Sequence, residues 1–203
     1  MKLILTRHGE TEDNAEKIIQ SHLPGKLSPE GEAQAEKLAQ RLKDEKIDII
    51  FSSDLKRAAD TAKIVAKYHP EAELVFTEDL REGDAGDFTG KRSDEVDWSN
   101  RPANAETLEQ IRERVTKLLI RVYESHSHNN VLFVGHNGVN KSLIGLISGR
   151  PVADMVKADN QKNTAVNIFE IKEDGNYKIC LINCTKHLGL CGAEPQSSEG
   201  ITI

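Results

Sequence analysis

The chain has few cysteines, and their number and placement exclude a disulfide scaffold. Only three occur among 203 residues, Cys180, Cys184 and Cys191, and all three lie late in the sequence. A disulfide framework uses paired cysteines spread along a chain, so we expect free thiols instead. Together with His187 these cysteines could form a metal cluster, but their spacing is not one of the standard zinc patterns.

Long apolar runs and an excess of basic charge are also missing. No stretch approaches the roughly 20 apolar residues that a membrane span needs. The apolar run at the N-terminus, residues 3–5, is too short for a secretory signal, so we expect a cytoplasmic protein. The net charge of −6 and the lack of a long basic run argue against nucleic acid or an anionic membrane surface as a partner. An acidic chain can still take a small anionic substrate, because local arginines override the global sign.

What remains is an ordinary globular composition with alternating strand and helix patterns. The length suggests one domain, which we place at residues 1–188, followed by a polar tail at 189–203 that we expect to be mobile or loosely docked. The alternation predicts an α/β fold. The expected strands are 3–6, 47–51, 73–76, 130–135, 165–171 and 177–182, the last two forming an antiparallel hairpin at the sheet edge. The expected helices are 28–46, 55–68 with a cap from Ser52, Ser53 and Asp54, 106–124 and 139–148.

One stretch, residues 79–105, breaks this alternation. It is rich in glycine and charge, and we expect a loop there with one short helix around 93–98. Loops of this length inside a compact domain are usually functional.

The first chemical candidates follow directly after the first predicted strand. Arg7 and His8 open the stretch Arg-His-Gly-Glu-Thr. Ligands of open α/β sheets bind at the carboxyl ends of strands, so this pair lies where a ligand would sit. Arginine offers phosphate oxygens a planar fork of donors, and histidine can be a nucleophile, acid or base near neutral pH. The pair indicates phosphoryl chemistry, although the dipeptide alone would more often arise by chance.

Three further candidates lie at strand ends or in the break. Arg57 lies in the first turn of a helix, His136 follows a strand directly, and Glu82 lies in the irregular stretch. Arg57 alone would be interpreted as a solvated helix charge. Glu82 has acidic neighbours that compete for any role: Glu78, Asp79, Asp84 and Asp87. Two imidazoles and two arginines, each just beyond a predicted strand, nevertheless favour a common site. The other histidines lie in surface-like contexts and are expected to have no chemical role: His22, His69, His126, His128 and His187.

Four motifs in order resemble the histidine phosphatase superfamily. They are Arg-His-Gly-Glu-Thr at 7–11, Ser-Ser-Asp-Leu-Lys-Arg-Ala at 52–58, Leu-Arg-Glu at 80–82 and Gly-His-Asn-Gly at 135–138. The resemblance spans about residues 2–183. This superfamily includes cofactor-dependent phosphoglycerate mutases, a bisphosphatase acting on fructose 2,6-bisphosphate, and many small phosphatases. The resemblance implies a three-layer α/β/α sandwich whose mixed, mostly parallel sheet has helices on both faces, with a short cap insertion at about 83–105.

The resemblance also implies a role for each candidate residue. His8 would be the nucleophile that takes the phosphoryl group, and Glu82 would give a proton to the leaving group. Arg7, Arg57 and His136 would hold the phosphate oxygens. Asn14 matches a further phosphate-binding position. Asn137 stands where a glycine is frequent, which is acceptable because its backbone would make the contact.

Elementary chemistry agrees with these roles. Hydrolysis of a phosphate ester is among the slowest uncatalysed reactions in water. A phosphorylated histidine replaces one hard step with two easier ones. Fixed cationic and N–H donors can stabilise the charge on the phosphoryl oxygens. We therefore expect neither a metal nor a cofactor.

Two departures from the mutase pattern favour a phosphatase. The aromatic and acidic stretch that mutases carry after the first motif is absent from residues 20–26, and the cap is short. A mutase must exclude water long enough to return the phosphoryl group, and a short cap leaves the pocket open. We predict a phosphomonoester hydrolase. Mutase-type phosphoryl transfer and a non-enzymatic relative that binds phosphorylated ligands are the alternatives.

An open pocket admits a small phosphorylated metabolite or a phosphoprotein, and the sequence does not choose between them. Three basic residues in the cap, Lys91, Arg92 and Arg101, either meet a second anionic group of the substrate or are ordinary surface charges. The oligomeric state is not set by the sequence.

Overall fold

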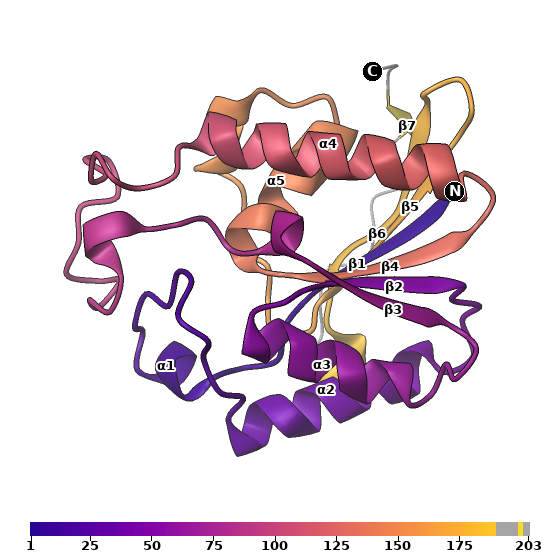
Figure 1. Ribbon diagram of the computed structural model, residues 1–203, viewed down its shortest axis with the longest axis horizontal. Coiled ribbons are helices and arrows are strands. Elements are labelled where there is room, and N and C mark those ends of the chain that lie inside the picture. The colour runs from indigo at the N-terminus through magenta and orange to yellow at the C-terminus, as the bar shows by residue number, and fades with distance from the viewer. Residues whose placement is uncertain (190–198, 201–203) are drawn as a thin grey trace.

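A mixed sheet lies between two layers of helices in the computed structural model, which describes residues 1–189 and 199–200 (Figure 1). The strands are β1 (Lys2–Arg7), β2 (Ile49–Ser53), β3 (Glu73–Thr77), β4 (Asn130–Gly135), β5 (Val166–Ile171), β6 (Tyr177–Cys184) and β7 (Glu199–Gly200). The helices are α1 (Glu12–Ala15), α2 (Pro29–Leu42), α3 (Lys56–Ala66), α4 (Leu108–His126) and α5 (Asn137–Ile147). Four short 3₁₀ turns lie at Glu78–Leu80, Gly86–Phe88, Val152–Met155 and Lys186–Leu188.

The strand order is β3-β2-β4-β1-β5-β6-β7. β3, β2, β4 and β1 run parallel to one another, whereas β5, β6 and β7 add antiparallel pairs. The predicted mixed α/β sheet is therefore confirmed, as is the antiparallel hairpin β5–β6, although β7 and not this hairpin forms that edge of the sheet. Because β1, β2 and β4 are parallel neighbours, their carboxyl ends meet at one edge of the sheet.

A hydrophobic core on each face of the sheet holds a layer of helices against that face, which gives the three-layer architecture. Residues of β1 alternate between the faces, as a strand requires: Leu3 and Leu5 pack with the helices α4 and α5, whereas Ile4 packs with α2 and α3. Figure 1 shows the same division, with α4 and α5 on one side of the sheet and α2 and α3 on the other. Burial on both faces accounts for the uninterrupted apolar run of β4.

The loop after β1 packs closely against the start of α2, and a glycine lies on each side of this contact, Gly9 in the loop and Gly31 in the helix. Ser28 caps α2 by accepting a hydrogen bond from the Gly31 N–H group at 3.0 Å, and Pro29 takes the first helical position. A Cβ on Gly31 would lie 1.9 Å from the Glu10 carbonyl oxygen, and a Cβ on Gly9 would lie 2.4 Å from the Gly31 carbonyl oxygen. The loop after β1 can reach its position only because neither residue has a side chain.

Gly31→Ala is therefore expected to destabilise the protein. Because the clashing atoms belong to backbone, relief requires a shift of the whole loop, and we expect a loss of about 2–3 kcal/mol, at the upper end of overpacking effects. Urea unfolding measures the change. Glu32→Ala, at the exposed neighbouring position on the same helix, is the control and should stay within about 0.5 kcal/mol. Equal stability of the two variants would contradict this account of the contact.

Two local predictions are wrong. The N-cap of α3 is Leu55, which has no side-chain cap, because the Ser52 hydroxyl donates to the Ser53 carbonyl and the Asp54 carboxylate accepts from Arg81. Ser53 does stabilise the backbone just before α3, since its hydroxyl accepts a hydrogen bond from the Leu55 N–H group at 3.2 Å.

The short helix expected at 93–98 is also absent, because this part of the cap is bonded to another segment. The Ser93 N–H group donates to the Lys17 carbonyl at 2.8 Å, and the Ile19 N–H group donates to the Lys91 carbonyl at 2.9 Å. These tertiary hydrogen bonds flank an isolated β-bridge between Ile18 and Arg92, and residues 93–98 follow it as turns and bends. The same hydrogen bonds also fasten the cap to the segment that follows α1, which no local sequence pattern indicated.

The C-terminal predictions are only partly within the described residues. Cys180 is half-buried, Cys184 is buried, and both are free thiols, whereas Cys191 lies outside the described part of the chain. Within the described residues no group of histidine, cysteine and carboxylate side chains could hold a metal ion. Most of the predicted tail likewise lies outside them, although β7 pairs with β6 at Tyr177 and Lys178. None of the described helices is long and apolar enough to cross a membrane.

Candidate active site

The sheet edge formed by the ends of β1 and β4 brings the two predicted histidines together. His8 follows β1, and its N–H group donates to the Gly135 carbonyl at the end of β4 at 3.1 Å. His136 is the N-cap of α5. The two ring centroids lie 5.0 Å apart, and the residues are 3% and 0% exposed. Residues that are distant in sequence thus share one buried pocket.

The His8 ring is fixed in one tautomer. Its Nδ1 atom lies 2.7 Å from the Gly9 carbonyl oxygen, which can only accept, so Nδ1 carries the proton and Nε2 keeps its lone pair. The surrounding backbone is held as well: the Gly9 N–H group donates to the Thr61 hydroxyl at 3.1 Å, and the Asn163 amide donates to the His8 carbonyl at 3.0 Å. Nε2 therefore keeps a lone pair in a defined orientation, which is what a nucleophilic attack requires.

Both predicted arginines are held by backbone carbonyls. Arg57, only 1% exposed, donates from Nη1 to the Leu23 carbonyl at 2.6 Å and from Nη2 to the Ser21 carbonyl at 2.8 Å. Arg7 donates from Nη1 to the Gln161 carbonyl at 2.7 Å. These bonds fix each guanidinium plane without neutralising its charge, because a carbonyl is not an anion.

The same residues carry buried polar atoms that have no partner among the described residues. These atoms are Nε of Arg7, Nε of Arg57, and both ring nitrogens of His136. A buried polar group without a hydrogen bond costs about 1–3 kcal/mol, so several in one place require an explanation. Two cations and a second imidazole around His8 fit a site for an anion with several oxygens.

Burial and the neighbouring cations shift the proton affinities in this pocket. The pKa of His8 is lowered well below its usual 6.5 by burial first and then by Arg7 and Arg57. The pKa of His136 is lowered in the same direction by burial, Arg57 and His8. Burial also lowers the pKa of Arg57 to about 10. At neutral pH His8 is thus uncharged, as a nucleophile must be, and Arg57 remains charged.

These shifts predict that acid destabilises the fold. Below pH 6.5 both imidazoles take protons in the unfolded chain but stay neutral in the folded one, so stability is lost as the pH falls. Between pH 7.5 and 5.5 each buried imidazole should remove about 1.4 kcal/mol from the free energy of unfolding. Urea unfolding in phosphate-free buffer should show this loss reduced by about that amount in His136→Gln. An identical pH dependence in the variant would contradict the assignment.

Glu82 faces the same pocket from the N-terminus of α5. Its carboxylate oxygens accept hydrogen bonds from the Gly138 N–H group at 3.1 Å and the Val139 N–H group at 3.3 Å. The two bonded N–H groups lie two and three residues after His136 in the first turn of α5. The competing acids are engaged elsewhere: Glu78 with Arg81, Asp79 with Arg121, Asp84 with Ser21 and Asp87 with Asn104.

The two predicted asparagines lie at the margin of the pocket. Asn14 closes a capping box with Thr11, and its side-chain oxygen accepts from Asn163 at 3.4 Å. Because Asn163 also donates to the His8 carbonyl, Asn14 is linked to His8 through one intervening residue. Asn137 is the first residue of α5, where backbone N–H groups have no intrahelical partner. Its side chain is bonded to Asn160 and to the Gln161 N–H group.

Several contributors to the site were missed in the sequence. The carbonyls of Ser21, Leu23 and Gln161 carry no residue-specific signal, since any residue could supply them. Asn163 precedes a strand without a recognisable motif. Lys141 could have been found, because it lies one helical turn after Asn137; burial lowers its pKa, and Glu82 opposes that shift.

The remaining histidines only partly match the surface-like contexts expected for them. His69 is buried, and burial lowers its pKa. His22 is exposed as expected, but its ring Nε2 lies 2.8 Å from the Glu82 carbonyl oxygen, so it borders the site. His187 contacts the Thr164 hydroxyl at 3.1 Å.

Comparisons with known proteins agree with this fold. The sequence profile of the histidine phosphatase superfamily (branch 1) matches residues 3–185. "Phosphoglycerate mutase-like protein 4" of Arabidopsis thaliana is 35% identical over 203 residues, covering 92% of this chain and 86% of its own. "Uncharacterized phosphatase PhoE" of Bacillus subtilis (strain 168) is 35% identical over 187 residues, covering 91% and 95%. A crystal structure of phosphoserine phosphatase in complex with 3-phosphoglyceric acid, from Entamoeba histolytica, superposes with a TM-score of 0.82 at 27% identity and covers 92% and 98% of the two chains.

Proposed function

The chain belongs to the histidine phosphatase superfamily, branch 1, and from this premise we propose that it hydrolyses phosphomonoesters through a phosphorylated His8. The observation that carries the proposal is the fixed His8 tautomer, with Nε2 presented beside two carbonyl-held arginines and a buried second imidazole.

The first step transfers the phosphoryl group to the enzyme. The Nε2 lone pair of His8 attacks phosphorus, and the bond between phosphorus and the ester oxygen breaks. Protonated Glu82 gives its proton to that oxygen, and the alcohol leaves. Glu82 enters this step from the N-terminus of α5, where its carboxylate is bonded beside His136.

The second step returns the enzyme to its starting state. Water attacks the phosphorus of the phosphohistidine, and the Glu82 carboxylate takes the proton that the water loses. The bond between phosphorus and Nε2 breaks, which releases inorganic phosphate and neutral His8. Glu82 is again protonated, so the cycle balances without an added reactant.

Arg7, Arg57 and His136 stabilise the charge on the phosphoryl oxygens in both steps. Fixed donors in a buried site act strongly because they need no reorganisation as the charge develops. The N-terminus of α5 adds a favourable helix dipole and the N–H group of Asn137, because the N–H groups of Gly138 and Val139 donate to Glu82. We propose that this donor set is sufficient without a metal ion.

Hydrolysis is favoured over mutase-type transfer by the cap. Its basic residues are largely engaged within the protein: Arg92 with Asp94 and the Glu16 carbonyl, and Arg101 with the Glu106 carbonyl. A short cap with engaged cations does not enclose an intermediate against water, which a mutase requires. One relative is nevertheless named as mutase-like, so the test must separate the two reactions.

For the substrate we propose a small phosphorylated metabolite. The Entamoeba histolytica phosphatase with the same fold is described with 3-phosphoglyceric acid, a phosphomonoester that also carries a carboxylate. A phosphoprotein is the second candidate, because the short cap gives access to bulky groups.

The decisive experiment measures phosphate release from p-nitrophenyl phosphate and from a panel of phosphometabolites that includes a phosphohistidine peptide, all in EDTA. We expect turnover in EDTA and a base-stable, acid-labile phosphoenzyme. Rapid isomerisation of 3-phosphoglycerate with a trace of 2,3-bisphosphoglycerate, without phosphate release, would instead indicate a mutase. Tight phosphate binding without turnover of any ester would indicate a non-enzymatic relative.

A further inference from the structure

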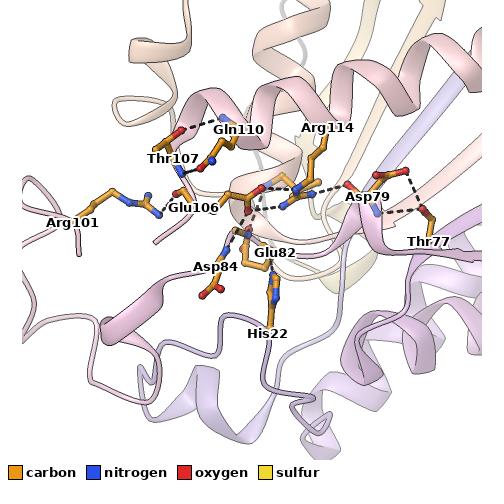
Figure 2. A network of polar contacts seen from close by, with 12 residues as sticks. His22, Thr77, Asp79, Glu82, Asp84, Arg101, Glu106, Thr107, Gln110 and Arg114 are labelled. Atoms are coloured by element: carbon orange, nitrogen blue, oxygen red, sulfur yellow. Dashed lines mark hydrogen bonds and ion pairs between the residues drawn. The ribbon is translucent and has the colours of Figure 1, made fainter. Parts of the chain in front are cut away.

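We propose that the ion pair between Glu106 and Arg114 is a positioning device for Glu82, the proton donor of the proposed reaction. The hydrogen bonds of these two residues within the described part of the chain reach neither His8 nor His136, although the charge of Arg114 helps to lower the pKa of His136. Arg114 binds the backbone before Glu82, and Glu106 binds the backbone after it. Figure 2 shows both residues in one network of polar contacts with that segment. This inference rests on the proposed function.

Arg114 holds the segment before Glu82. It lies on α4 and forms a bidentate pair with Glu106, with Nε donating to Oε1 at 2.7 Å and Nη2 donating to Oε2 at 3.0 Å. The remaining nitrogen, Nη1, donates to the Asp79 carbonyl at 2.6 Å. The side chains of Arg114 and Glu106 are only 20% and 17% exposed, so solvent screens this pair less than it screens a surface pair.

Glu106 holds the segment after Glu82. Its Oε2 atom accepts from the Asp84 N–H group at 3.2 Å, and its own N–H group donates to the Asp84 carbonyl at 2.9 Å. One ion pair thus ties both Asp79 and Asp84 to the start of α4, and Glu82 lies between these two attachment points.

The backbone between the two attachment points is also fixed by packing. Leu80 is fully buried in the core beside α4. A Cβ on Gly83 would lie 2.6 Å from the Ile111 side chain, so the chain at this glycine lies directly on the helix. From the opposite side the His22 ring contacts the Glu82 carbonyl at 2.8 Å.

The position of this backbone decides where the acid acts. A mutation far from the reacting atoms that misplaces a reacting group by about 1 Å can cost on the order of 10²-fold in rate. Proton donation matters only when the leaving oxygen needs a proton. A p-nitrophenolate is a weak base and leaves without a proton. An alkoxide is a strong base and must be protonated as it leaves. A positioning role for Glu106 and Arg114 must therefore depend on the leaving group, and a merely structural role must not.

The test compares Arg114→Gln with the wild-type protein on two substrates, p-nitrophenyl phosphate and β-glycerol phosphate. We measure kcat/KM, which reports the steps up to the first departure of a leaving group. For β-glycerol phosphate we expect a loss of about 10- to 30-fold, a fraction of the full contribution of a general acid. For p-nitrophenyl phosphate we expect a change below about 3-fold, because this leaving group needs no proton.

Lys117→Gln is the matched control. Lys117 lies on the same helix and pairs with Glu113, but both side chains are 64% exposed and neither touches the Glu82 segment. It should leave both substrates unchanged. Arg114→Lys keeps the charge but not the bidentate fork, and we expect an intermediate, still substrate-dependent loss.

Equal losses on both substrates, or no loss on either, would overturn the positioning role. If Arg114→Gln does not fold, Glu106→Gln and Arg114→Lys carry the same comparison. A wild-type protein that turns over neither substrate would instead refute the proposed function, so the two failures are distinguishable.

Discussion

His8→Ala is expected to abolish turnover, lowering kcat/KM for p-nitrophenyl phosphate by at least about 10³-fold, and to abolish phosphoenzyme formation. The variant loses the one atom that can form the covalent intermediate, because Nδ1 is bonded to the Gly9 carbonyl and only Nε2 keeps a lone pair. The anion site should survive, since Arg7 and Arg57 are held by carbonyls that do not involve the His8 side chain. Rapid quenching with a radiolabelled substrate measures the first effect, and titration with inorganic phosphate measures the second.

His128→Ala is the control for a histidine without a role, because His128 is exposed after the end of α4. It should keep full activity and the full yield of phosphoenzyme. A His8→Ala protein that still turns over ester, or still accumulates an acid-labile phosphate adduct, would move the nucleophile to another residue, and His136 would then be the first candidate.

Secondary structure could be predicted from the sequence wherever the local residue pattern and the global fold favour the same element. The strand at 130–135 was predicted with the bounds that β4 has, because its apolar run ends in a glycine and its burial on both faces leaves no competing pattern. The prediction for the cap is wrong because there the local pattern and the global fold disagree. Residues 93–98 have local helical features, but backbone hydrogen bonds tie the chain here to residues 17–19, and such bonds are not readable from either segment alone.

The candidate site divides in the same way. Side chains with distinctive chemistry, such as His8 and His136, could be found because each follows a predicted strand and the sheet brings strand ends together. The groups that orient them could not, because they are mostly backbone carbonyls. Those of Ser21 and Leu23 bind Arg57 only through the path that the loop takes, which depends on the left-handed conformation of Gly25 at φ 62°.

The second large effect is expected from Arg57→Ala. We propose that this arginine binds both the anion and the loop, since its guanidinium donates to two carbonyls of residues 21–23 and its buried Nε has no partner within the described part of the chain. A Cβ on Gly25 would lie 3.1 Å from the Arg57 Cδ atom, so the loop packs on the arginine stem as well. Removing the side chain should lower kcat/KM by about 10²- to 10³-fold, as loss of a transition-state donor does. It should also lower the free energy of unfolding by about 2–4 kcal/mol, because buried carbonyls lose their donors and a cavity forms.

Arg57→Lys separates these two contributions. Lysine keeps a positive charge and most of the stem, but a single ammonium cannot bind both carbonyls and an anion in one plane. We therefore expect most of the stability to return while kcat/KM stays at least about 10-fold below wild type. Added guanidinium ion should partly restore the activity of Arg57→Ala, because the cavity has the shape of the lost group. Lys56→Ala, one residue earlier and exposed, is the control and should leave both quantities unchanged. Arg57→Ala could instead keep its activity within about 3-fold of wild type while its free energy of unfolding falls. The arginine would then only stabilise the loop, and the anion would be bound by Arg7 and His136.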